Sequence, residues 1–253
     1  MRYLLLACVL GYVCAVRADE PRGPALSPHR IYPPEAGFFS KELDFQGIPI
    51  KASKVVSDGA LVEAYARLFQ MFEKMGPYRE IVIGRLVQAG VEVHIIGKDQ
   101  VTTDLPEWRE DKGRPLPEYD GLTRDERTRG MGGRLMSCGE ENLLRLPEDR
   151  YRGRDIFVHE FAHCIRNFGI SPEVRKQFDE RYQQSLKKGL WVDAYSSTNP
   201  DEFFAEISMW YFGTHGDLGM KGAKPKFGRG GLRDYDPDTF ALFDDFYQGR
   251  SSF

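Results

Sequence analysis

The sequence contains an H-E-x-x-H motif at residues 159–163. On a helix, His159 and His163 are four residues apart, so both imidazoles leave the same face and can bind one metal ion. Glu160 lies beside them, where its carboxylate can take a proton from a water molecule that the metal activates. These residue types at this spacing predict a zinc site with a general base, which is the chemistry of a metal-dependent hydrolase.

A catalytic zinc usually takes three protein ligands, and the motif supplies two. The longer pattern H-E-x-x-H-x-x-G-x-x-H is excluded, because Arg166 stands in place of its glycine and Gly169 in place of its last histidine. Cys138 is one remaining option, since peptide deformylases combine H-E-x-x-H with a cysteine ligand. That ligand set would give a metal hydrolase that is not a peptidase. Glu202 is the other option.

Glu202 belongs to a helix predicted over residues 199–212, where it shares a face with Glu206, one turn later. Phe203 and Trp210 lie on the adjoining apolar face. Two acids on a helix are ordinarily solvated. The upstream H-E-x-x-H motif favours a different interpretation, in which Glu202 binds the metal and Glu206 accepts a hydrogen bond from the second ring nitrogen of a ligating histidine.

Together, H-E-x-x-H at 159–163 and Y-S-S-T-N-P-D-E-F-F-A-E at 195–206 resemble the catalytic domain of the anthrax lethal factor-like metallopeptidases, within the gluzincins. The resemblance covers both motifs and the spacing between them, about a fifth of the chain. It implies a zincin-like α+β fold with a small mixed sheet, an active-site helix and a mainly helical C-terminal half.

The resemblance also implies the roles of individual residues and a peptide or protein substrate. The ligands that it implies for one Zn²⁺ per chain are His159, His163 and Glu202. Glu160 would be the general base, and Tyr195 would donate a hydrogen bond to the oxyanion. The segment 135–146 would supply an edge strand that pairs with an extended substrate.

Two other interpretations stay open beside the peptidase. One is a zincin-fold binding protein that keeps the metal without turnover. The intact Glu160 argues against it, because loss of that carboxylate is the simplest route to an inactive metal site. The other is a metal-free globular domain in which the motif is a coincidence, and the presence of both motifs argues against that.

The periodicity of apolar residues predicts the elements that position these side chains. A helix over 154–168 carries the H-E-x-x-H motif, and Phe157, Phe161 and Ile165 form a core-facing row on another of its faces. Further helices are predicted over 58–75, 80–89, 171–190, 199–212 and 237–247. Strands are predicted over 45–52, 91–96 and 135–146. Residues 103–134 are polar and predict a long excursion without a regular element.

The N-terminal region predicts export. Residues 1–18 combine a short apolar run with small residues before Asp19, as in a cleavable signal peptide, and the run is too short to span a bilayer. We therefore expect a secreted or periplasmic protein. Residues 19–37 are rich in proline and predict an extended leader, and residues 38–253 form the zincin-like catalytic domain.

Charge and cysteine content limit the partners. The chain has 35 Lys and Arg against 38 Asp and Glu, a net charge of −3, and loss of Arg2 and Arg17 with the signal peptide gives 33 − 38 = −5. Neither nucleic-acid binding nor membrane association after cleavage is expected. Cys138 and Cys164 remain in the mature chain, where they either pair as a disulfide or stay as two buried thiols.

Overall fold

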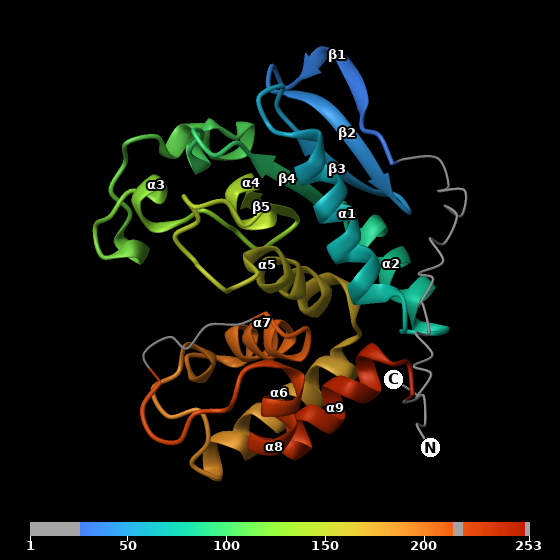
Figure 1. The fold of residues 1–253 in the computed structure, drawn as a ribbon, viewed down its shortest axis with the longest axis vertical. Coiled ribbons are helices and arrows are strands. Elements are labelled where there is room, and N and C mark those ends of the chain that lie inside the picture. Colours follow the sequence, from blue (N-terminus) through green and yellow to red (C-terminus); the bar gives the residue numbers. More distant parts are fainter. Residues whose placement is uncertain (1–25, 215–219, 251–253) are drawn as a thin grey trace, which may run out of the picture.

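The computed structural model describes residues 26–214 and 220–250, which form an α+β protein (Figure 1). One five-stranded mixed sheet has its strands in sequence order. The strands are β1 (His29–Glu35), β2 (Phe39–Phe45), β3 (Ile48–Ala52), β4 (Glu92–Ile96) and β5 (Leu135–Gly139). The first three are antiparallel, and β3, β4 and β5 are parallel.

The first two strands correct the predicted boundary of the fold. β1 lies inside the segment 19–37, for which an extended leader was predicted, and β2 precedes the first predicted strand. β1 is an edge strand with mostly exposed side chains, so it carries no alternation of apolar residues. Pro33 and Pro34 fall where the register with β2 shifts, a position that tolerates proline in an edge strand.

The sheet lies in the upper part of the molecule in Figure 1, and the helices that pack on it include α1 (Asp58–Phe72), α2 (Tyr78–Gln88) and α5 (Ile156–Cys164). The core-facing row predicted for the motif helix is confirmed, because Phe157 and Phe161 of α5 and Ile165, in the π-helical turn Ile165–Gly169 that follows it, are fully buried. Phe161 meets Phe72 of α1 edge to face, with ring centroids 6.0 Å apart. The opposite face of α5 is left for the motif.

The C-terminal part is helical, as predicted. It contains α6 (Pro172–Lys187), α7 (Pro200–Tyr211), α8 (Gly228–Tyr235) and α9 (Pro237–Tyr247), of which only α8 was not predicted. Phe178, Phe204, Phe243 and Phe246 join α6, α7 and α9, with ring centroids 4.8 Å apart for the first two. Helix α7 packs directly against α5, and one hydrophobic core runs through both parts.

The segment 135–146 is a strand only over its first half. After β5, residues Glu140–Leu143 form the short helix α4. The Glu140 carboxylate accepts backbone N–H groups of Ser57 and Lys98, at 2.8 and 2.9 Å. The Glu141 carboxylate forms a bidentate ion pair with the Arg129 guanidinium, with both contacts at 2.7 Å. These long-range bonds end the strand, and local sequence does not reveal them.

The excursion 103–134 contains short 3-10 turns and the four-residue helix α3 (Arg124–Arg127). Within the described residues, no helix has the length and apolar character needed to cross a membrane. The predicted signal peptide, residues 1–18, lies outside the described residues.

Candidate metal centre

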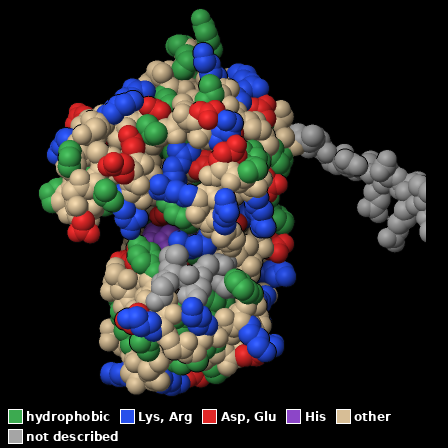
Figure 2. All heavy atoms as spheres, turned by 60° about the vertical axis from the view of Figure 1, so that its left-hand side comes forward, with side chains coloured by type: hydrophobic (Ala, Val, Ile, Leu, Met, Phe, Trp, Pro, Cys, Tyr) green, Lys and Arg blue, Asp and Glu red, His purple; other side chains and the backbone are tan. Residues whose placement is uncertain are grey.

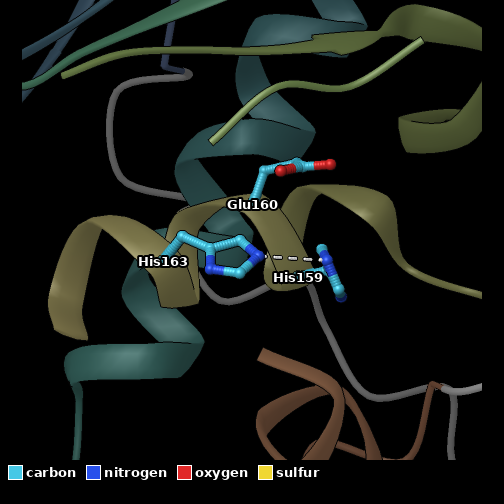
Figure 3. A group of neighbouring side chains, drawn as sticks. All are labelled: His159, Glu160 and His163. Atoms are coloured by element: carbon cyan, nitrogen blue, oxygen red, sulfur yellow. Dashed lines mark hydrogen bonds between the residues drawn. The ribbon is translucent and has the colours of Figure 1, made fainter. Parts of the chain in front are cut away.

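Helix α5 is fixed at its start by Asp155, whose carboxylate accepts the backbone N–H of Val158 at 3.1 Å. Arg67 of α1 donates to the same carboxylate at 2.6 Å. This cap sets the rotation of α5, so that one face enters the core and the other carries His159 and His163 (Figure 3). The motif therefore lies on a helix in the way the spacing predicts.

The structure brings Glu202 to both histidines. The Nε2 atoms of His159 and His163 are 3.2 Å apart. Glu202 Oε2 lies 3.2 Å from the first Nε2 and 3.6 Å from the second. Zinc binds such ligands at about 2.0–2.1 Å in a tetrahedron, which places ligand atoms roughly 3.3 Å from each other. The three atoms thus have the separations of three corners of a zinc tetrahedron.

The chemistry of the donors agrees with this spacing. Glu202 Oε2 is buried and makes no hydrogen bond with the described residues. An orphaned, buried carboxylate oxygen facing two imidazole nitrogens suits a bound cation. His159, Glu160 and His163 also offer ligand atoms within 4.8 Å of one another. Glu202 Oε2, 3.2 and 3.6 Å from the two imidazole nitrogens, could hold the third position of such a cluster, and the Glu160 carboxylate would then lie beside the ion.

A buried ion pair lies on the Nδ1 side of the His159 ring. Its Nδ1 lies 3.0 Å from Glu206 Oε1, although the ring N–H does not point in line with that oxygen. Arg154 forms a salt bridge with the same Glu206 oxygen, and both side chains are at least nine-tenths buried. Glu206 was predicted at this place from its spacing. Arg154 was not, because one arginine before a helix carries no signal in the sequence.

Burial and charge shift the pKa values of the site. Burial disfavours protonation of His159, but contacts with Glu202 and Glu206 outweigh it and raise the pKa of His159 to about 10. Burial would raise the pKa of Glu202, whereas His159 and His163 hold it well below its usual range. Burial raises the pKa of Glu160, against the opposing effect of the two histidines. A carboxylate of raised basicity beside the metal position is suited to proton transfer.

Tyr195 stands on a short 3-10 turn, Tyr195–Ser197, just before α7. Asn199 then caps α7 by accepting the backbone N–H of Glu202 at 2.8 Å, which links the turn to the start of the helix that carries Glu202. Burial, with Glu202 nearby, raises the pKa of Tyr195 to about 12. Its hydroxyl therefore keeps its proton at neutral pH and can donate a hydrogen bond.

All five predicted site residues line one cleft of about 660 Å³. They are His159, Glu160, His163, Tyr195 and Glu202. In Figure 2 a histidine is visible at the bottom of a hollow between the upper and lower parts of the molecule, with basic side chains around it. The arrangement opens the metal position to a ligand from solvent.

A glycine-rich segment, Gly130–Gly133, forms the wall of the cleft above Glu160. Its Met131 pairs with Ser137 of β5 through two antiparallel hydrogen bonds, N–H to carbonyl, at 3.0 and 2.9 Å. A Cβ atom on Gly130 would lie 2.5 Å from Ile156 Cγ2, so only glycine fits there. β5 is the last strand of the sheet, so the edge strand predicted within 135–146 is confirmed, but its Ser137 pairs with Met131, and the segment Gly130–Gly133 lies between β5 and the cleft.

The cysteines do not form a disulfide. Cys138 and Cys164 are both free and buried. The Cys164 thiol donates to the carbonyl of Gly133 at 3.2 Å, and burial raises the pKa of Cys164 to about 12. Burial likewise raises the pKa of Cys138, which belongs to the hydrophobic core and does not line the cleft. Cys138 is thus not placed as a ligand.

The fold and the site define an α+β protein with a His-His-Glu cluster and a neighbouring carboxylate in an open cleft. A scan against models of protein families found no match, and a search of curated proteins found no significant relative.

Proposed function

We propose that this protein is a zinc-dependent metallopeptidase of the gluzincin class, with a zincin-like fold, acting on a peptide or protein substrate outside the cytoplasm. The observation that carries the proposal is the triangle of His159 Nε2, His163 Nε2 and Glu202 Oε2, with sides of 3.2, 3.2 and 3.6 Å. His159, His163 and Glu202 would hold the ion. When bound, zinc polarises a carbonyl group and lowers the pKa of water toward about 7.

Two side chains would carry out the proton and charge chemistry. The Glu160 carboxylate accepts the proton of the attacking water and later delivers it to the leaving amine. The Tyr195 hydroxyl donates a hydrogen bond to the oxygen on which negative charge develops. Removal of one such donor costs about 3 to 4 kcal/mol of transition-state stabilisation in other enzymes.

The wall segment Gly130–Gly133 would orient the substrate. Met131 directs its N–H and carbonyl toward Ser137, and in an extended segment the neighbouring residues Gly130 and Gly132 would direct theirs to the opposite side. An extended peptide can pair with such an edge, which holds its scissile bond over Glu160.

The test measures zinc content and cleavage of a peptide library by the purified protein and two variants. Glu160→Gln should keep one zinc per chain and lose activity, at least about a hundredfold for a general base. Glu202→Ala should lose both zinc and activity. Glu173→Ala is the matched control, because Glu173 also lies in the first turn of a helix that begins with proline but is exposed.

Each alternative interpretation predicts a different outcome of this experiment. Absence of stoichiometric zinc in the wild type would overturn the proposal. If zinc binding is kept in Glu202→Ala but lost in Cys138→Ala, the third ligand is Cys138 and not Glu202. One zinc per chain without cleavage of any peptide would point to a zincin-fold binding protein.

A further inference from the structure

Arg127, the last residue of α3, lines the cleft together with Tyr195 and Glu202. The Arg127 side chain is exposed to solvent within this cleft lining. An exposed arginine is usually solvated. At this place its neighbours argue for a specific role.

The two acids beside Arg127 in the sequence are both engaged elsewhere. Asp125 accepts the backbone N–H and the hydroxyl of Thr103, at 2.8 and 2.7 Å. Glu126 accepts the backbone N–H and the hydroxyl of Thr123, both at 2.8 Å, in a capping box. Neither carboxylate is therefore directed toward Arg127.

The first residue of α3 anchors the helix. The Arg124 guanidinium binds Asp111 at 2.6 Å and lies 4.0 Å from the centre of the Trp108 ring. It also donates to the Tyr119 hydroxyl at 3.0 Å. A buried, fully bonded arginine at one end of a four-residue helix holds the residue at the other end in place over the cleft.

The other charged side chains among the described residues that line the cleft are either paired with an opposite charge or belong to the candidate metal centre. Arg154 is paired with Glu206, and Asp201 lies 3.3 Å from Arg166. Glu160 and Glu202 belong to the metal centre. Among the cleft-lining residues that the structure describes, Arg127 is the cation for which no acidic partner is found.

We infer that Arg127 recognises a carboxylate of the substrate, and so selects peptides that carry a negative charge near the cleaved bond. The inference rests on the proposed function and narrows it to a substrate class. Guanidinium and carboxylate form charge-assisted, two-pronged hydrogen bonds, which discriminate strongly against neutral analogues. The carboxylate can come from an Asp or Glu side chain or from a free C-terminus, which share this chemistry.

The experiment compares cleavage of a random peptide library by the wild type and by Arg127→Glu. Wild type should enrich Asp or Glu over Gln and Asn at one subsite by about tenfold or more, the size of a hydrogen bond to a charged group. Arg127→Glu should abolish that enrichment and favour Lys or Arg, mainly through KM. Arg152→Glu is the control, because Arg152 is also exposed but does not line the cleft.

A second arm separates this inference from the function itself. Zinc-loaded Glu160→Gln, with and without Arg127→Glu, captures peptides from the same library without cleaving them. If acidic peptides are enriched in the captured fraction but the wild type cleaves no peptide, the inference about Arg127 is supported and the proposed peptidase activity is contradicted. Cleavage without acid enrichment, or enrichment unchanged by Arg127→Glu, would overturn the inference alone. Neither cleavage nor enriched capture would overturn both.

A third arm identifies the source of the carboxylate. The library is prepared with free and with amidated C-termini. Selection that disappears on amidation assigns the carboxylate to the peptide terminus, whereas selection that survives assigns it to an acidic side chain.

Discussion

At the scale of residues, the salt bridge between Arg154 and Glu206 holds the Glu206 carboxylate in contact with the His159 ring. With zinc bound and His159 neutral, Arg154→Met would leave Glu206 buried without a cation, at a cost on the order of 3 kcal/mol of stability. It should also weaken zinc binding about 10- to 100-fold, as loss of groups that orient a ligating histidine does. Urea unfolding and competition with a chelator measure the two effects.

Arg152→Met is the matched control for Arg154→Met, since Arg152 is exposed and two residues away. It should leave both stability and zinc affinity at wild-type values. Wild-type zinc affinity in Arg154→Met would show that Glu206 does not need this cation to orient the imidazole.

Zinc binding should release a proton. The pKa of His159 is raised to about 10, so the ring is protonated at neutral pH and must become neutral before Nε2 can bind a metal. Zinc affinity should therefore rise by about tenfold per pH unit up to that pKa for one released proton. Calorimetry at pH 7 in two buffers of different ionisation enthalpy counts the protons, and a count of zero would contradict this.

The sequence predicted the residues whose spacing is local. His159 and His163 share one helix turn, and Glu202 and Glu206 share another, so periodicity alone places each pair on a face. Arg154 could not be predicted, because its partner is 52 residues away. Such a contact exists only after α5 and α7 have packed.

At the scale of elements, the wall segment Gly130–Gly133 depends on the absence of side chains. Gly130→Ala should push the segment away from Ile156 and Glu160, at a cost of about 1–3 kcal/mol for overpacking, and lower kcat/KM by more than tenfold. Gly84→Ala is the control, because a Cβ on Gly84 in α2 would meet nothing within 4 Å. It should be neutral or stabilise the protein by up to about 1 kcal/mol. Activity assays and urea unfolding of both variants make the comparison, and equal effects would contradict it.

Periodicity predicted the long helices and missed the edge strand β1. Helices α1, α6 and α7 have an apolar stripe and capping residues, namely Ser57, Ser171 and Asn199, that mark their starts. β1 is held by backbone pairing with β2 and buries almost no side chains, so its sequence reads as a polar leader. Strand pairing between segments cannot be read from either one alone.

At the scale of the whole molecule, His94 joins the sheet to the excursion 103–134. Its Nδ1 lies 2.6 Å from Glu107 and its Nε2 lies 3.2 Å from Glu92. Burial opposes protonation, but these two carboxylates outweigh it and raise the pKa of His94.

His94→Gln should destabilise the protein more at low pH than at high pH. A raised folded-state pKa means that the stabilisation is complete below the unfolded value of about 6.5 and is lost as the pH rises through the folded value. Urea unfolding at pH 6 should show a loss of about 1–3 kcal/mol, which shrinks toward pH 9. His29→Gln, on the exposed strand β1, is the control and should leave the stability near the wild-type value. A loss that grows with pH would contradict this assignment.

The packing of α5 against α7 has a consequence for the order in which the protein matures. The two histidines lie one turn apart on α5, whereas Glu202 arrives from α7, after the intervening helix α6 has turned the chain back. If zinc binds as proposed, a nascent chain can offer it only the two histidines until α7 docks on α5. Tight zinc binding would then be a late event that follows completion of the core, and the proposed hydrolytic centre would form only in the finished chain.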